Sequence, residues 1–249
     1  MAMHNAKDIY AKRTLDFIER IQLMRSYDEI CAHILKEMEW FGFSCVTSFS
    51  VPGAGQTLKD CLWMNNRPQD YIDRYSEKNY ILHDPVVAEF RRTIYPYSWS
   101  DIRAKRVLKK TEKAIIDEAR EWGARDGFMV PIVTRSGLMS GFCPCGFEPN
   151  LSPRARAALE VIAIYSHHAL MRAVLQVRRE ETAHTPLTPR EREIMQWVAV
   201  GKTDEEIGQI LNLGTSTVAS HIENAKRKLD TFRRTHAVAQ AIRLGEISL

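Results

Sequence analysis

The sequence predicts a two-domain α/β protein: an N-terminal α-β-α sandwich with a mostly antiparallel sheet, then an all-α helix-turn-helix domain. Three observations lead to this prediction. The first part alternates segments of helical apolar spacing with short β-branched and aromatic segments. The polar stretch "QVRREETAHTPLTPRERE" then interrupts the chain and carries Pro186 and Pro189. Only helical patterns follow it, which predicts an all-α domain at the C-terminal end.

These patterns place the first domain at residues 1–176, a linker at 177–186 and the second domain at 187–249. The composition, 45% hydrophobic and 27% charged, is that of a globular protein, and the formal net charge of +4 permits nucleic-acid binding without requiring it. The polar start and the lack of a long apolar run predict a cytoplasmic protein with no membrane segment. The odd count of five cysteines is typical of reduced thiols.

The first domain is expected to begin with two amphipathic helices and a β-hairpin. Apolar residues recur at helical spacing near 6–25 and 27–41. The segment "FSCVTSFSV" is predicted to be a strand, "PGAGQ" a turn and "LKDCLWM" the partner strand. A short helix at 68–78 then places Tyr71 and Tyr75 on one face.

The second half of this domain should complete the sheet. The segment "RTIYPYSW" is predicted to be a third strand, weakened by Pro96, and 110–122 a helix that ends at Gly123. "GFMVPIVTR" and "LMSGFCPCGF" predict a hairpin that turns at Ser136-Gly137. The helix near 153–176 is apolar around most of its circumference, so it either contacts a second subunit in a homodimer or is buried by its own domain.

The C-terminal segment carries the signals of a helix-turn-helix. Pro189 stands in the first turn of one helix, and Thr203 with Glu206 forms a capping box at the start of the next. The short turn "NLG" leads to a third helix from about Thr215 to Leu229.

The third helix begins with short polar side chains and ends in cations, as suits groove and phosphate contacts. A solvated helix with an ordinary basic end is the alternative, but the caps, turn and basic end together favour double-stranded DNA. The residues predicted to bind DNA are Lys202, Thr203, Thr215, Ser216, Thr217, Ser220, His221, Asn224, Arg227 and Lys228.

This segment resembles the LuxR-type DNA-binding domain. The family pattern of a Glu, a Leu four residues later and a Gly six beyond it is matched by Glu191, Met195 and Gly201. Met for Leu keeps volume and apolarity, and Gly214 stands where the family usually has a Ser N-cap. The resemblance implies a dimer whose two recognition helices read an inverted repeat, with RNA polymerase as a candidate partner.

The first domain is similar to the autoinducer-binding domain of the same family, which senses N-acyl-homoserine lactones in quorum sensing. The family has a Trp and a Tyr four apart, an Asp-Pro, and a Trp fifteen beyond the Asp. Here these positions are Tyr71, Tyr75, Asp84-Pro85 and Trp99, and Gly127 matches a family glycine. This sequence departs from the family pattern at Tyr71, where the family has Trp.

The resemblance implies a role for each position. Asp84 would accept from the ligand amide N–H, Tyr75 would donate to the acyl carbonyl, and Trp99 would be a flat wall for the lactone ring. In the family, the Trp at this position donates to the lactone carbonyl. The hydroxyl of Tyr71 can also donate, but it lies at a different distance from the backbone than an indole N–H.

Alternate side chains of the first hairpin should face one side of the sheet, and the resemblance implies that this side lines the acyl chain. Phe49 and Trp63 are bulky and are expected to shorten the cavity. This predicts a short, branched or aryl acyl group. Cys143 matches a position near the acyl group, or it is simply a small buried residue. The residues predicted to line the acyl side are Thr47, Phe49, Val51, Cys61, Trp63, Val87 and Cys143.

Enzyme chemistry is a competing class, but the sequence offers little for it. The candidates are His83-Asp84, His167-His168 and Cys143-Pro144-Cys145, without a nucleophile-elbow motif or a second metal-ligand pair. We therefore expect no catalysis, no metal and no cofactor. Two regulators remain as alternatives: one that senses a different small molecule or acts without a ligand, and a phosphorylation-driven response regulator, which the strand pattern disfavours.

Overall fold

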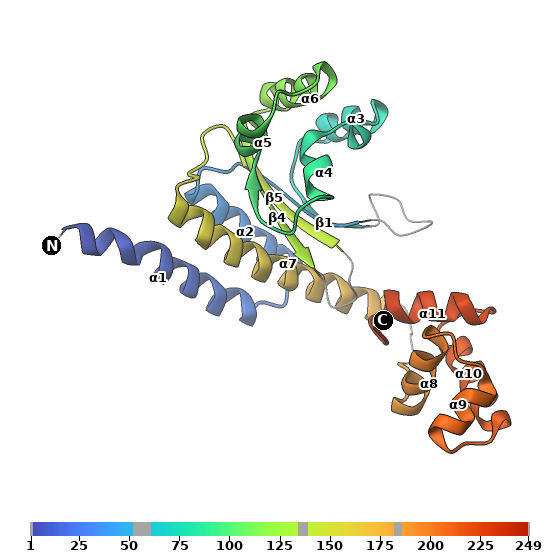
Figure 1. Cartoon of the computed structure of the whole chain (residues 1–249). Helices are drawn as coiled ribbons and strands as arrows, with labels where there is room; N and C mark the ends of the chain where they lie inside the picture. Colours follow the sequence, from blue (N-terminus) through green and yellow to red (C-terminus); the bar gives the residue numbers. More distant parts are fainter. Residues whose placement is uncertain (1, 52–60, 134–138, 182–185, 249) are drawn as a thin grey trace. The chain divides into compact units, whose positions relative to one another are not determined.

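The computed structural model describes residues 2–51, 61–133, 139–181 and 186–248 (Figure 1). The chain separates into two compact units, the first of which ends at Gln176, while the second continues from Val177. In the described ranges no helix has the combination of length and apolarity needed to cross a membrane.

The first unit is built on a five-stranded sheet in the order β2-β1-β5-β4-β3. All neighbouring strands are antiparallel, as the sequence predicts. The expected turns at 52–56 and at Ser136-Gly137 lie outside the described residues. The strands are β1 (Cys45–Ser50), β2 (Leu62–Asn65), β3 (Tyr97–Ser98), β4 (Asp126–Val133) and β5 (Met139–Gly146).

Helices cover both faces of this sheet, which confirms the predicted α-β-α sandwich (Figure 1). One face packs against α1 (Ala2–Leu23), α2 (Tyr27–Trp40) and α7 (Pro153–Glu181). The other face lies under α3 (Gln69–Glu77), α4 (Pro85–Phe90), α5 (Trp99–Lys105) and α6 (Lys110–Glu121).

Each face has its own hydrophobic core because side chains alternate along the strands. Phe128, Val130 and Phe142 point to the α1, α2 and α7 side. Met129 and Cys143 point to the other side, where they join the aromatic residues of α3 and α5. The second core is the one that contains a cavity.

The predicted strand over 92–99 is mostly wrong. Only Tyr97 and Ser98 pair with β4, and a helix begins at Trp99. The reason is local: Ser98 and Asp101 form a capping box, in which the Ser98 Oγ accepts from the Asp101 N–H at 3.1 Å and Asp101 accepts from the Ser98 N–H at 2.8 Å. Helix α4 and the 3₁₀ turn η2 (Tyr80–Leu82) were also not predicted.

The second unit is all-helical, as predicted, and has its own apolar core. Its helices are α8 (Pro189–Ala199), α9 (Asp204–Leu211), α10 (Thr215–Lys228) and α11 (Arg234–Arg243). The predicted capping box of Thr203 and Glu206 starts α9, and Asn212 in the left-handed conformation ends it. Helix α11 was not predicted; Arg234 fastens it to Asp204 and to the Lys202 carbonyl.

Candidate functional site

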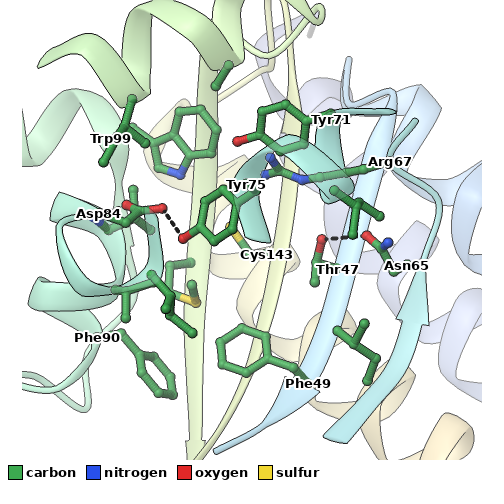
Figure 2. A pocket seen from close by; sticks show the side chains of 18 of the residues that line it. Thr47, Phe49, Asn65, Arg67, Tyr71, Tyr75, Asp84, Phe90, Trp99 and Cys143 are labelled. Atoms are coloured by element: carbon green, nitrogen blue, oxygen red, sulfur yellow. Dashed lines mark hydrogen bonds between the residues drawn. The ribbon is translucent and has the colours of Figure 1, made fainter. Parts of the chain in front are cut away.

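A cavity of about 180 Å³ lies in the first unit, between the sheet and the helices α3 to α6 (Figure 2). Its wall is mostly apolar, with a few polar side chains that come from different elements. This is the usual build of a small-molecule site. Of the residues predicted to bind a ligand, the cavity is lined by Thr47, Phe49, Val51, Tyr71, Tyr75, Asp84, Val87, Trp99 and Cys143.

Asp84 has two tasks in this wall. Its Oδ1 accepts from the Val86 N–H at 2.7 Å and so caps α4, and its Oδ2 accepts from the Tyr75 hydroxyl at 2.8 Å (Figure 2). Asp84 is therefore the N-cap of α4, but this role occupies only one of its oxygens. Burial raises the pKa of Asp84 above its ordinary value, against these hydrogen bonds. The carboxylate is thus costly to keep charged, and a further donor would stabilise it.

The two tyrosines of α3 stand beside this carboxylate. Their ring centres are 6.0 Å apart, as the spacing of four residues predicts. Burial raises the pKa of Tyr71 to about 12, so its phenol keeps its proton. Burial and the neighbouring Asp84 carboxylate also raise the pKa of Tyr75. Both groups can therefore donate hydrogen bonds at neutral pH.

Trp99 forms a flat wall at one end of the cavity. It is buried and lines the cavity, and its indole Nε1 has no hydrogen-bond partner within the described part of the chain, so it offers a ligand both its ring face and an N–H donor. The ring lies directly on the sheet at Gly127, where a Cβ would stand 2.6 Å from the indole. Gly127 is thus the position that lets the indole lie flat on β4.

We therefore expect Gly127→Ala to reduce ligand binding by roughly 10-fold or more, because the added methyl pushes Trp99 into the cavity. Isothermal titration with a stabilising ligand measures this. Gly123→Ala is the matched control for unfolding, since Gly123 has no atom within 4 Å of an added Cβ but has a φ of +85°. The control should lower stability and leave affinity unchanged; equal affinity in both variants would contradict the assigned role of Gly127.

The predicted alternation on the first hairpin is wrong at Cys61 and Trp63. A β-bulge between Ser48 and Phe49 brings Leu62 opposite Phe49 and Asn65 opposite Thr47. Leu62 and Asn65 therefore line the cavity in their place. Trp63 instead lies in the core beneath the sheet, where its Nε1 donates to the Ser50 Oγ at 2.7 Å. One shifted residue reverses the faces of a strand.

Several further lining residues were missed by the sequence reasoning. Arg67 and Asn65 add polar groups near the end of β2, and Phe90 closes one side against Phe49, with 5.3 Å between ring centres. Phe90 could have been found, since it is on the same short helix as Val86 and Val87. Arg67 carries no local signal, because a lone arginine after a strand usually points to solvent.

The residues predicted to bind DNA differ in their exposure in the second unit. Thr215, Ser216, Thr217 and Ser220 are exposed at the start of α10, and Arg227 is exposed near its end. Other members are already engaged: Lys202 pairs with Glu206 at 2.8 Å, and Thr203 caps α9. His221 and Asn224 are half-buried, and Asn224 accepts from Arg227 at 2.9 Å.

Lys228 is less exposed than its neighbour Arg227. Its Nζ lies 2.7 Å from the Glu191 Oε2, and the two side chains are only 19% and 5% exposed. Burial opposes the charge of Glu191, but Lys228 and the Thr188 N–H lower its pKa overall. Lys228 therefore joins α10 to α8, and its charge is largely neutralised.

The two histidines of the pair considered for catalysis have different surroundings, one buried and one exposed. His167 is buried, with its Nδ1 2.9 Å from the Ser48 Oγ, whereas His168 is exposed. Burial lowers the pKa of His167 to about 4 and raises the pKa of Cys143 to about 11. No group of three or more potential metal ligands occurs in the part of the chain that the structure describes.

Known proteins resemble this chain over both units. Residues 26–170 match the family described as "Autoinducer binding domain", and residues 185–241 match "Bacterial regulatory proteins, luxR family". The quorum sensing-dependent transcriptional regulator RpaR of Rhodopseudomonas palustris is 32% identical over 97% of both chains. The transcriptional activator BjaR1 of Bradyrhizobium diazoefficiens is 31% identical, over 94% of this chain and 96% of its own.

A solved structure shares the fold. The crystal structure of Escherichia coli SdiA superposes with a TM-score of 0.73 and 21% identity, over 95% of this chain and 98% of that one. At this identity the likeness supports the fold of the chain.

Proposed function

Since this chain belongs to the LuxR family of quorum-sensing transcriptional regulators, and is not an enzyme, we propose that its first domain binds an N-acyl-homoserine lactone. The bound protein would then act as a homodimer on an inverted-repeat promoter site in the cytoplasm, with RNA polymerase as a candidate partner. The domains would be residues 1–176 for signal binding and dimerisation, 177–186 as linker and 187–249 for DNA binding.

One observation carries the ligand assignment. Asp84 and Tyr75 place an acceptor and a donor 2.8 Å apart in a mostly apolar wall. A secondary amide presents the complementary N–H and C=O. The amide N–H would donate to Asp84 in place of the Tyr75 hydroxyl, and that hydroxyl would turn its single hydrogen to the acyl carbonyl, which accepts it as the family resemblance implies. The ring would lie on Trp99.

The size of the cavity supports a small acyl group. The cavity has a volume of about 180 Å³ and is bounded by Phe49 of β1, whose ring lies on Gly141, and by Phe90 of α4. We infer that Phe49 would limit the acyl group as expected, and that Phe90 would supply the second bulky wall that was expected of Trp63. We therefore propose a short, branched or aryl acyl group.

Ligand binding would be coupled to folding. The empty site leaves a buried carboxylate short of donors and apolar walls short of contacts. A ligand that supplies both stabilises the folded domain by mass action. The enclosed complex would then support dimerisation and DNA binding by the exposed start of α10 and by Arg227.

A thermal-shift panel tests this proposal. Purified protein is melted with N-butanoyl-, N-(2-methylpropanoyl)-, N-benzoyl- and N-dodecanoyl-homoserine lactone. We expect a rise of several degrees with a short, branched or aryl member, because binding at 100 times Kd stabilises by about 2.7 kcal/mol. A preference for the dodecanoyl compound would contradict the acyl proposal. No shift with any lactone would favour the alternative, a regulator of this family with another signal or none.

A further inference from the structure

Arg67 is a charged residue inside the cavity for which no role has been assigned. It follows β2 and is half-buried, and its guanidinium reaches into the pocket beside Tyr71 (Figure 2). The guanidinium carbon lies 5.1 Å from the centre of the Tyr71 ring and 5.8 Å from the Trp99 ring. Arg67 therefore stands at the aromatic end of the cavity, where two ring faces hold its planar group.

Arg67 acts on the Asp84 carboxylate, whose pKa its charge lowers, and on the Tyr71 hydroxyl, but it forms no direct ion pair among the described residues. No ion pair within 4.0 Å joins it to a carboxylate among the described residues, and the Asp84 oxygens are engaged by Tyr75 and Val86. A guanidinium has five N–H donors, and a partly buried one is stable only when acceptors satisfy it. A ligand that presents an oxygen at this end would supply the acceptor.

Tyr71 is a poorer candidate for that contact. It is only 5% exposed, and its ring is packed between the Tyr75 ring at 6.0 Å and the Trp122 ring at 6.1 Å, with the guanidinium over it. Its position suits a support for Arg67 better than a donor to the ligand.

We propose that Arg67 is the specificity-determining donor of this site and binds the carbonyl oxygen of the lactone head group, in place of a donor at position 71. This assignment rests on the proposed lactone ligand. Asp84 and Arg67 then form an acceptor and a cationic donor that match the amide N–H and the ring carbonyl. A charge-assisted hydrogen bond is stronger than a neutral one, so the site selects for the head-group carbonyl.

The test compares two ligands that share an acyl group. One is the homoserine lactone that stabilises the wild-type protein most in the thermal panel, and the other is the amide of cyclopentylamine with the same acyl group, which lacks the ring carbonyl. Titration calorimetry should show the wild type binding the lactone roughly 10–100-fold more tightly. In Arg67→Met this ratio should fall toward one, whereas in Tyr71→Phe it should be kept.

Two further variants separate this role from stability. Arg67→Lys keeps the charge but not the planar fork, so it should give an intermediate ratio even if Arg67→Met fails to fold. Arg92→Met removes an exposed charge outside the cavity lining and should leave the ratio unchanged.

The assignment is overturned if Arg67→Lys and Arg67→Met keep the wild-type ratio, or if Tyr71→Phe loses it. If the wild type binds neither compound, the lactone proposal itself fails, and the assignment fails with it. If it binds both compounds equally, the ligand class stands and only the role of Arg67 is wrong.

Discussion

Asp84→Asn should weaken lactone binding by roughly 10–100-fold, because a hydrogen bond to a charged group is worth about 1.5–3 kcal/mol. The same change should leave the ligand-free protein as stable as the wild type or more stable. Asn keeps an oxygen that can cap α4 at the Val86 N–H, and the buried charge is removed. Titration calorimetry and urea unfolding without ligand measure the two effects.

The matched control is Asp73→Asn, on the exposed side of α3, where the carboxylate accepts only a local bond from Gln69. It should change neither affinity nor stability appreciably. If Asp84→Asn bound the lactone as tightly as this control, Asp84 would be a helix cap and nothing more.

The pH dependence of the ligand-free protein gives a second view of Asp84. Its folded pKa is raised above the ordinary value of 3.8, mainly by burial. Between these two values the folded state binds more protons than the unfolded state, so stability should fall as the pH rises through this window. Asp84→Asn should remove this part of the slope, which urea unfolding at several pH values can detect. An unchanged slope would mean that Asp84 is better solvated than its contacts indicate.

Two adjacent cations of α10 should give opposite results when each is changed to Met. Lys228→Met should destabilise the second unit by about 2–3 kcal/mol, because it leaves the buried Glu191 carboxylate without its cation. Arg227→Met should leave stability unchanged, because its side chain is exposed and its bond to Asn224 is local. Urea unfolding of the full chain measures both.

In DNA binding we expect the opposite pattern: Arg227→Met should have an effect and Lys228→Met should not. With a duplex of arbitrary sequence, Arg227→Met should weaken binding and reduce the slope of log K against log salt by roughly 0.9 if one phosphate contact is lost. At temperatures where Lys228→Met remains folded, its slope should match the wild type. A Lys228→Met variant that is stable but loses the salt-dependent contact would contradict this division.

The Glu191–Lys228 pair also predicts acid sensitivity. The folded pKa of Glu191 is lowered below its ordinary value of 4.5, so its contribution is present above 4.5 and is lost as the pH falls through the folded pKa. Lys228→Met should therefore make the second unit less sensitive to acid over that range, in unfolding experiments monitored by circular dichroism.

Much of the site could be predicted because its parts are set by local spacing. Tyr71 and Tyr75 are four residues apart on one helix, and Asp84 stands directly before a proline that starts the next. These spacings depend only on residues that are close in the sequence, so they do not depend on how the rest of the chain folds.

Pro189 in the first turn of α8 and the capping box of Thr203 and Glu206 are equally local signals, which is why the boundaries of the helix-turn-helix could be predicted nearly correctly. The capping box of Thr188 and Glu191 was not predicted.

The predictions were wrong where the pairing of strands that are distant in the sequence determines the structure. Trp63 was assigned to the cavity by simple alternation, but the bulge opposite β1 turns it to the other face. The strand expected over 92–99 ends early because β4 pairs with only two of its residues before the Ser98 cap starts a helix.

By itself, the sequence determined the fold class, the order of most elements, the regulator family and most of the polar and aromatic residues of the candidate site. Only the tertiary structure decided which side of the sheet Trp63 faces, that Arg67 lies beside the Tyr71 and Trp99 rings, and that Lys228 pairs with Glu191. The physical reason is that helix periodicity and capping act within a few residues. The face of a strand and the partner of a charge depend on segments far away in the chain, which meet only when it folds.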